Sequence, residues 1–120
     1  MRRSVAILTT LLCTLALTAA CGDDEKDAGT GAGDTKVIDI AFADGSVSPN
    51  GDRVEVDKGQ PVELVVKADE PGEIHVHSTP EQELEYGAGT TTLKLSIDRP
   101  GVVDVEAHEL EVTIVQLEVH

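Results

Sequence analysis

Residues 53–66 read RVEVDKGQPVELVV, and this stretch predicts two β-strands joined by a turn. Apolar side chains stand at alternate positions on both sides of the turn: Val54, Val56, Val62, Leu64 and Val66. Alternation of this kind over a short run is typical of a half-buried strand. The intervening DKGQP combines Gly and Pro, which favour a turn over a continuing strand. The stretch therefore predicts an all-β fold.

The same alternation recurs along the rest of the chain. It is found in the segments 38–42, 74–76, 93–97, 103–105 and 115–119. The segments between them contain turn-forming residues, as in ADGSVSPNGD, ADEPGE, YGAG and DRPG. No segment shows a sustained helical period. About seven strands at this spacing predict an antiparallel β-sandwich or barrel with Greek-key connections.

Composition excludes several classes of function. The chain has 23 Asp and Glu against 9 Lys and Arg, a formal net charge of −14, which disfavours nucleic acid as a partner. It has one Phe, one Tyr and no Trp, so it offers few rings for stacking on bases. The core must therefore be built from branched aliphatic side chains. No pattern of catalytic residues stands out, and we expect the protein not to be an enzyme.

The N-terminus predicts export and attachment to a membrane. Residues 1–20 combine the basic start MRRS, an apolar run and small residues before Cys21, as in a bacterial lipoprotein signal. Thr18 departs from the usual pattern, so cleavage that leaves Cys21 as a free thiol is the alternative, and an uncleaved anchor is a third. We expect cleavage before Cys21, lipidation (palmitate) of that cysteine, and a location at the extracytoplasmic face of the cell membrane. Residues 21–35 have the composition of an acidic, Gly-rich tether, and residues 36–120 form one domain.

Histidines are the candidate ligands, because residues 36–120 contain no cysteine. In EIHVHS, residues 73–78, Ile74 and Val76 face the core, so Glu73, His75 and His77 share the opposite face. Side chains two apart on a strand are separated by roughly 6.5–7 Å and can lean toward one metal.

Two further histidines occur near the end of the chain. His108 ends VVDVEAH and shares the outward parity of Glu106. His120 lies at the other end of the hairpin expected over 101–119, so it is not a partner of His108.

Most of residues 36–120 resembles a cupredoxin-like domain, in particular that of small exported lipoproteins of actinobacterial type. The resemblance rests on RVEVDKGQPVELVV, HVH and PGVVDVEAH. It implies an eight-stranded Greek-key sandwich in which His75 and His108 lie at the same rim. Electron-carrying members also have a cysteine, which is missing here, and a methionine, whereas the only Met of this chain is its first residue. A type 1 copper centre is therefore excluded.

Two functions remain open from the sequence. In the first, His75, His77 and His108 bind a metal, with Glu106, Glu109 or Glu73 as further ligands; Cu(II) is favoured over Zn(II) by intrinsic affinity. Such a protein would be a carrier, buffer or sensor of copper. In the second, the domain holds no metal and contacts another protein of the cell envelope.

Overall fold

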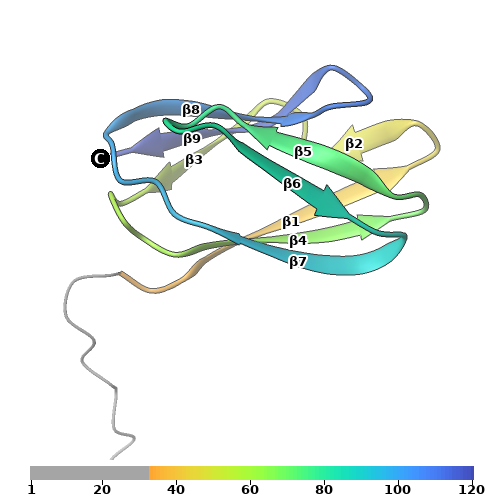
Figure 1. Cartoon of the computed structure of the whole chain (residues 1–120), viewed down its shortest axis with the longest axis horizontal. Coiled ribbons are helices and arrows are strands. Elements are labelled where there is room, and N and C mark those ends of the chain that lie inside the picture. The colour runs from red at the N-terminus through yellow and green to blue at the C-terminus, as the bar shows by residue number, and fades with distance from the viewer. Residues whose placement is uncertain (1–32) are drawn as a thin grey trace, which may run out of the picture.

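A computed structural model describes residues 33–120, which form two stacked β-sheets (Figure 1). The predicted signal and Cys21 lie outside the described residues. The strands are β1 (Lys36–Ala43), β2 (Ser46–Ser48), β3 (Asp52–Val56), β4 (Val62–Ala68), β5 (Gly72–Val76), β6 (Gln82–Tyr86), β7 (Gly89–Leu95), β8 (Gly101–Ala107) and β9 (Val112–Val119). Within residues 33–120, no helix has the length and apolarity needed to cross a bilayer.

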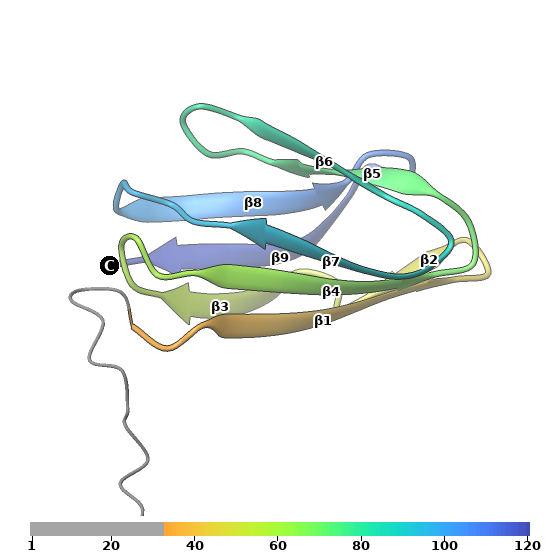
Figure 2. The same cartoon turned by 60° about the horizontal axis from the view of Figure 1, so that its bottom comes forward.

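The strands divide between the sheets by a Greek-key path. One sheet has the order β2-β1-β4-β7 and the other has the order β3-β9-β8-β5-β6. β8 and β9 form the expected hairpin, in which Gly101 lies opposite Val119 and Ala107 opposite Val112. Figures 1 and 2 both show the β8–β9 loop and the C-terminal residue at opposite ends of the sandwich. The all-β sandwich predicted from alternation is confirmed.

Two pairings differ from the antiparallel arrangement expected throughout. β1 pairs with β4 in parallel, and β3 pairs with β9 in parallel. In each parallel pair, the chain passes through the other sheet between the first strand and the second. It runs from β1 through β3 to β4, and from β3 through β4 and β8 to β9. Alternation shows which side chains a strand buries, but it carries no information on the direction of the neighbouring strand.

Two strands, β2 and β6, were not predicted. β2 has three residues, of which only Val47 is buried, so it has no detectable period. β6 is an edge strand in which Glu83 and Glu85 are exposed and Tyr86 is buried. Charged residues on an exposed edge strand oppose pairing with other chains. Here they also replace the alternating apolar residues by which a strand is recognised in the sequence.

The core is aliphatic, as the composition required. Its fully buried side chains are Ile40, Val62, Leu64, Val66, Ile74, Val76, Val105, Ile114, Val115 and Leu117. Each such side chain contributes about 1.5–3 kcal/mol by burial. All buried residues in the described part lie between Ile38 and Val119, and none of them is polar or charged apart from the hydroxyl of Tyr86. A chain that begins at residue 22 therefore keeps the whole core, and such a chain suits the experiments below.

Candidate metal site

β5 presents two candidate ligands on its outer face. Ile74 and Val76 are completely buried, whereas Glu73 and His75 are half-buried and His77, just past the strand, is exposed. The alternation predicted for EIHVHS is therefore confirmed. His75 has 18% of its side-chain area exposed, so it is fixed by neighbours but open to solvent on one side.

The β8–β9 loop brings His108 to the same place. Ala107, the last residue of β8, is paired with Ile74 of β5 and is completely buried. The next residue, His108, donates its backbone N–H to the Glu73 carbonyl at 3.1 Å. The position of His108 is thus set by main-chain pairing with β5, and its imidazole lies beside that of His75.

Glu73, His75 and His108 form a cluster that we call the rim triad. The two imidazole rings stack with centroids 4.4 Å apart and planes inclined by 28°. His75 Nε2 lies 2.5 Å from Glu73 Oε1. One ligand atom from each of the three residues lies within 4.8 Å of the others. Ligands at about 2.0–2.2 Å from a metal are roughly 3–4 Å apart, so modest side-chain rotations would allow all three to reach one ion.

The rim triad lies in a field that favours positive charge. The pKa of His75 is raised above 6.5, mainly by its hydrogen bond to Glu73 and further by the negative charges of Glu73, Glu83 and Glu81, while partial burial acts in the opposite direction. The carboxylates that stabilise an imidazolium would also stabilise a bound cation. Because Nε2 of His75 is in contact with Glu73, a metal ligated by both groups would displace the proton they share.

The remaining predicted ligands lie around the rim triad and outside it. The ring centroid of His77 is 6.4 Å from that of His75, and His77 Nε2 contacts Glu106 Oε2 at 2.9 Å. Glu109 accepts a weak hydrogen bond from the backbone N–H of Glu73 at 3.4 Å. The structure thus groups Glu73 with the two stacked histidines, and pairs His77 with Glu106 instead.

Glu81 was not among the expected ligands but lies between two of them. Its Oε1 is 3.7 Å from Nδ1 of both His75 and His77. The residue stands just before the edge strand β6, which hydrophobic alternation did not reveal. The acidic run PEQELEY was the only signal for it in the sequence.

The donor set excludes one kind of copper site and fits another. Residues 33–120 contain neither Cys nor Met, so they cannot provide the thiolate and the weak axial thioether of a type 1 centre. Two imidazoles and a carboxylate, in contrast, suit Cu(II) or Zn(II).

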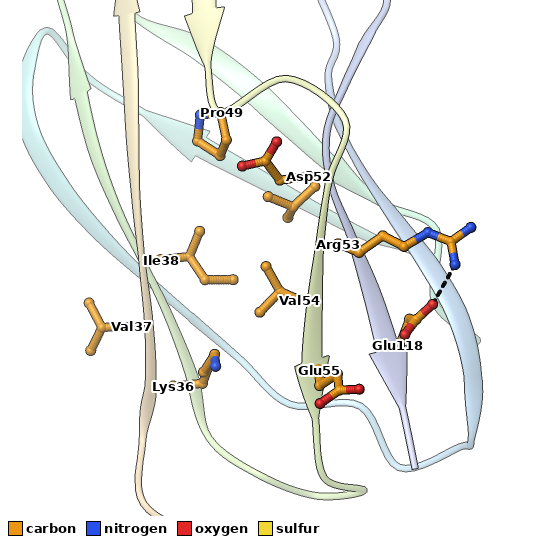
Figure 3. Close-up of a pocket in the computed structure, with 10 residues that line it drawn as sticks. Lys36, Val37, Ile38, Pro49, Asp52, Arg53, Val54, Glu55 and Glu118 are labelled. Atoms are coloured by element: carbon orange, nitrogen blue, oxygen red, sulfur yellow. Dashed lines mark hydrogen bonds and ion pairs between the residues drawn. The ribbon is translucent and has the colours of Figure 1, made fainter.

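A hollow on the described surface lies away from the rim triad. It is found between β1 and β3 (Figure 3) and shares no residue with the rim triad. Its lining mixes apolar and charged side chains: Lys36, Val37, Ile38, Pro49, Asp52, Arg53, Val54, Glu55, Val115 and Glu118. The rim triad therefore lies on an exposed rim, away from this hollow.

Comparison with known proteins identifies the fold. No protein-family model matches the chain, and no curated protein matches it. Among solved structures, a purple cupredoxin from Nitrosopumilus maritimus superposes with a TM-score of 0.52 at 14% identity, covering 71% of this chain and 99% of its own. A mutant of amicyanin, in its Cu(I) form, gives 0.50 at 14% identity over 70% of this chain and 82% of its own.

A third solved structure shows the same fold inside a larger protein. The multi-copper oxidase from Pseudomonas thermotolerans gives a TM-score of 0.53 at 16% identity, over 75% of this chain and 30% of that one. At these identities the similarity concerns the fold alone. Residues 33–120 thus have a cupredoxin-like fold, as the sequence motifs implied.

Proposed function

We propose that this protein holds one Cu(II) ion through Glu73, His75 and His108 at the extracytoplasmic face of a membrane. The observation that carries the proposal is the convergence of two stacked imidazoles and a carboxylate, with ligand atoms within 4.8 Å of one another. The protein would act as a carrier, buffer or sensor of copper. It would not be an enzyme, because no residue near the rim triad has an evident role as general base for a bound substrate.

The ligand types explain why the bound ion would be Cu(II). Among the divalent first-row metals, Cu(II) has the highest intrinsic affinity for nitrogen and oxygen ligands, and Zn(II) binds more weakly. Soft sulfur ligands, which select Cu(I), are missing from residues 33–120. The site would therefore retain the oxidised ion and would be unsuited to rapid electron transfer.

The N-terminal sequence supports the proposed location. The signal-like residues 1–20 and Cys21 would provide a lipid anchor, and residues 21–35 would link it to the domain. The formal charge of −14 would attract metal cations to the surface, although a high charge also serves solubility.

Titration of Cu(II) into the untagged chain from residue 22 tests the proposal. Calorimetry should give a tight site that depends on His75 and His108, and electron paramagnetic resonance of that site should show coupling to two imidazole nitrogens. His75→Ala and His108→Ala should each weaken binding by at least tenfold, because changes even in residues that only support a ligand cost about 10–100-fold. His77→Ala is the matched control and should leave affinity nearly unchanged.

Any Cu(II) bound by the free N-terminus or by surface carboxylates would persist in the His75→Ala/His108→Ala double variant. A Cu(II) affinity and stoichiometry that are the same in the double variant as in the unaltered chain would therefore refute the rim triad as the copper site. Loss of affinity in His77→Ala equal to that in His108→Ala would assign the site to a different set of ligands.

A second function is favoured by one observation: the rim triad is already satisfied by its own contacts, His75 with Glu73 and His75 with His108. In this alternative the domain is metal-free and contacts an envelope protein. Val37 and Val102, which are 52% and 58% exposed, would then be candidate contact residues. An identical melting temperature with Cu(II) and with a chelator, together with specific capture of an envelope protein, would support this alternative.

A further inference from the structure

Three other ligand-type side chains converge at the opposite end of the sandwich. Glu55 of β3, Glu118 of β9 and His120 each offer one ligand atom, and these atoms lie within 4.8 Å of one another. Figure 3 shows Glu55 and Glu118 on the neighbouring strands β3 and β9. We propose that these residues, the terminal triad, form a second site for a divalent metal of the Zn(II) type, independent of the proposed copper site.

The parallel pairing of β3 with β9 builds the terminal triad. Glu55 and Glu118 are direct partners in the register, so their side chains leave the same face of the sheet at the same level. His120 is two residues beyond Glu118 and therefore shares that face. Its backbone N–H donates to the Val56 carbonyl at 3.1 Å, and its carbonyl accepts from the Lys58 N–H at 2.9 Å. The backbone of His120 is thus fixed on both sides, and a ring nitrogen of His120 lies within 4.8 Å of a ligand atom of each carboxylate.

The carboxylates of Glu55 and Glu118 repel each other, and a bound cation would relieve this repulsion. Like charges directly opposite on paired strands are destabilising. Arg53 relieves part of the repulsion, since its guanidinium contacts Glu118 Oε1 at 2.7 Å (Figure 3). Oε2 of Glu118 remains available, and Glu55 has no ion-pair partner within residues 33–120. A divalent ion between Glu55, Glu118 and His120 would neutralise both carboxylates at once.

The donor set indicates a divalent first-row metal, and Cu(II) would compete with Zn(II) for it by the affinity order given for the rim triad. Imidazole and carboxylate groups each bind Zn(II) at about 2.0–2.2 Å, and three protein ligands leave the fourth position of the ion for water. Ca(II) and Mg(II) prefer oxygen ligands, so the imidazole selects against them. A hollow lined by Glu55, Val56, Asp57, Gln60 and His120 leaves space beside the triad for coordinated water.

Zn(II) is the probe for the test, and the chain from residue 22 carrying His75→Ala and His108→Ala is the parent protein. This background lacks the rim triad, so the result does not depend on the proposed copper function. We expect one equivalent of Zn(II) to bind, and His120→Ala or Glu118→Gln to weaken it by at least tenfold. Glu85→Gln, which removes one charge on the edge strand β6, is the matched control and should leave the affinity within a factor of about 2.

Two further measurements separate ligation from a structural role. Arg53→Gln should strengthen Zn(II) binding, because it removes the cation that competes for Glu118; a merely structural ion pair would give no such gain. Zn(II) at about 100 times its dissociation constant should raise the melting temperature by on the order of 10 °C. If the double background proves unstable, Zn(II)-induced shifts of the His120 ring in the NMR spectrum of the otherwise unaltered chain provide the same test.

The proposal is overturned if the parent binds no Zn(II), or if His120→Ala binds it as tightly as the parent does. Either result leaves the copper proposal untouched. The opposite combination is also distinguishable. If Zn(II) binding depends on His120 but Cu(II) affinity does not change in His75→Ala and His108→Ala, the terminal triad is supported and the rim triad is rejected.

Discussion

Gly72→Ala tests whether close packing at the start of β5 holds the rim triad in place. A Cβ at Gly72 would lie 2.7 Å from Tyr86 Cζ and 3.0 Å from Glu109 Oε2, and closer still to Tyr86 Oη. Ordinary van der Waals contact begins at 3.4 Å, so the tyrosine ring would have to move by at least about 0.7 Å. That ring is only 7% exposed and stacks on Phe42 with centroids 4.9 Å apart, so it has little room to move. Overpacking of this kind costs about 1–3 kcal/mol.

Urea denaturation of the chain from residue 22 measures the cost. Gly72→Ala should lower the free energy of unfolding by about 1–3 kcal/mol and the melting temperature by roughly 4–8 °C per kcal/mol. It should also weaken Cu(II) binding, because Glu73 is the next residue. Gly87→Ala is the matched control: nothing lies within 4 Å of its added Cβ, so it should be neutral or slightly stabilising.

A double-mutant cycle tests whether the Tyr86 side chain is the group that the added Cβ at position 72 would contact too closely. In a Tyr86→Leu background, which lacks the atoms nearest the new Cβ, the cost of Gly72→Ala should fall by at least about 0.5 kcal/mol. A free energy of unfolding for Gly72→Ala within about 0.5 kcal/mol of that of the unaltered chain, a range typical of surface substitutions, would refute close packing at this position. An equal cost of Gly72→Ala in both backgrounds would show that Tyr86 is not the side chain that the added Cβ contacts.

Two further predictions concern the charge of the triad and the core. The pKa of His75, followed by NMR in the metal-free protein, should lie above 6.5 and fall in Glu73→Gln; a His75 that titrates at or below 6.5 in the unaltered chain would contradict the assigned hydrogen bond. Because this pKa is raised on folding, the stability it contributes is fully present below the unfolded value near 6.5 and is lost as pH rises through the folded pKa. Leu64→Ala, at a completely buried position of β4, should cost about 2–5 kcal/mol in denaturation experiments. Val102→Ala, at a 58% exposed position, should cost less than about 1 kcal/mol, and equal costs at these two sites would refute the assigned core.

The sequence predicted most of the fold because burial on a strand leaves a periodic signature. The outward parity of His75 and the inward parity of Ile74 and Val76 follow from alternation alone. Strands β2 and β6 were not predicted from the sequence, because β2 is too short to show a period and β6 carries acidic residues on an exposed edge. The parallel β1–β4 and β3–β9 pairs were not predicted, because alternation specifies which face a side chain lies on and contains nothing about strand direction.

The candidate sites show the same division. Histidine as the ligand type follows from composition, since residues 36–120 contain no cysteine. The selection of Glu73 as the carboxylate beside His75 and His108, from among many acidic residues, required the side-chain positions. His120 was set apart from His108 by hairpin length, but its approach to Glu55 depends on the parallel β3–β9 register.

The sequence by itself determined the all-β fold, the aliphatic core, the lack of thiolate and thioether ligands in the domain, and the outward face on which His75, His77 and His108 lie. Only the tertiary structure decided which further side chains become neighbours across strands: Glu73 joins His75 and His108, whose common rim the resemblance had implied, and Glu55 joins Glu118 and His120 at the other end. The physical reason is that the face of the sheet on which a side chain lies is a local property of the extended backbone. Which side chains contact one another, in contrast, depends on the pairing of strands that are distant in sequence, and this pairing is fixed when the shared core is buried.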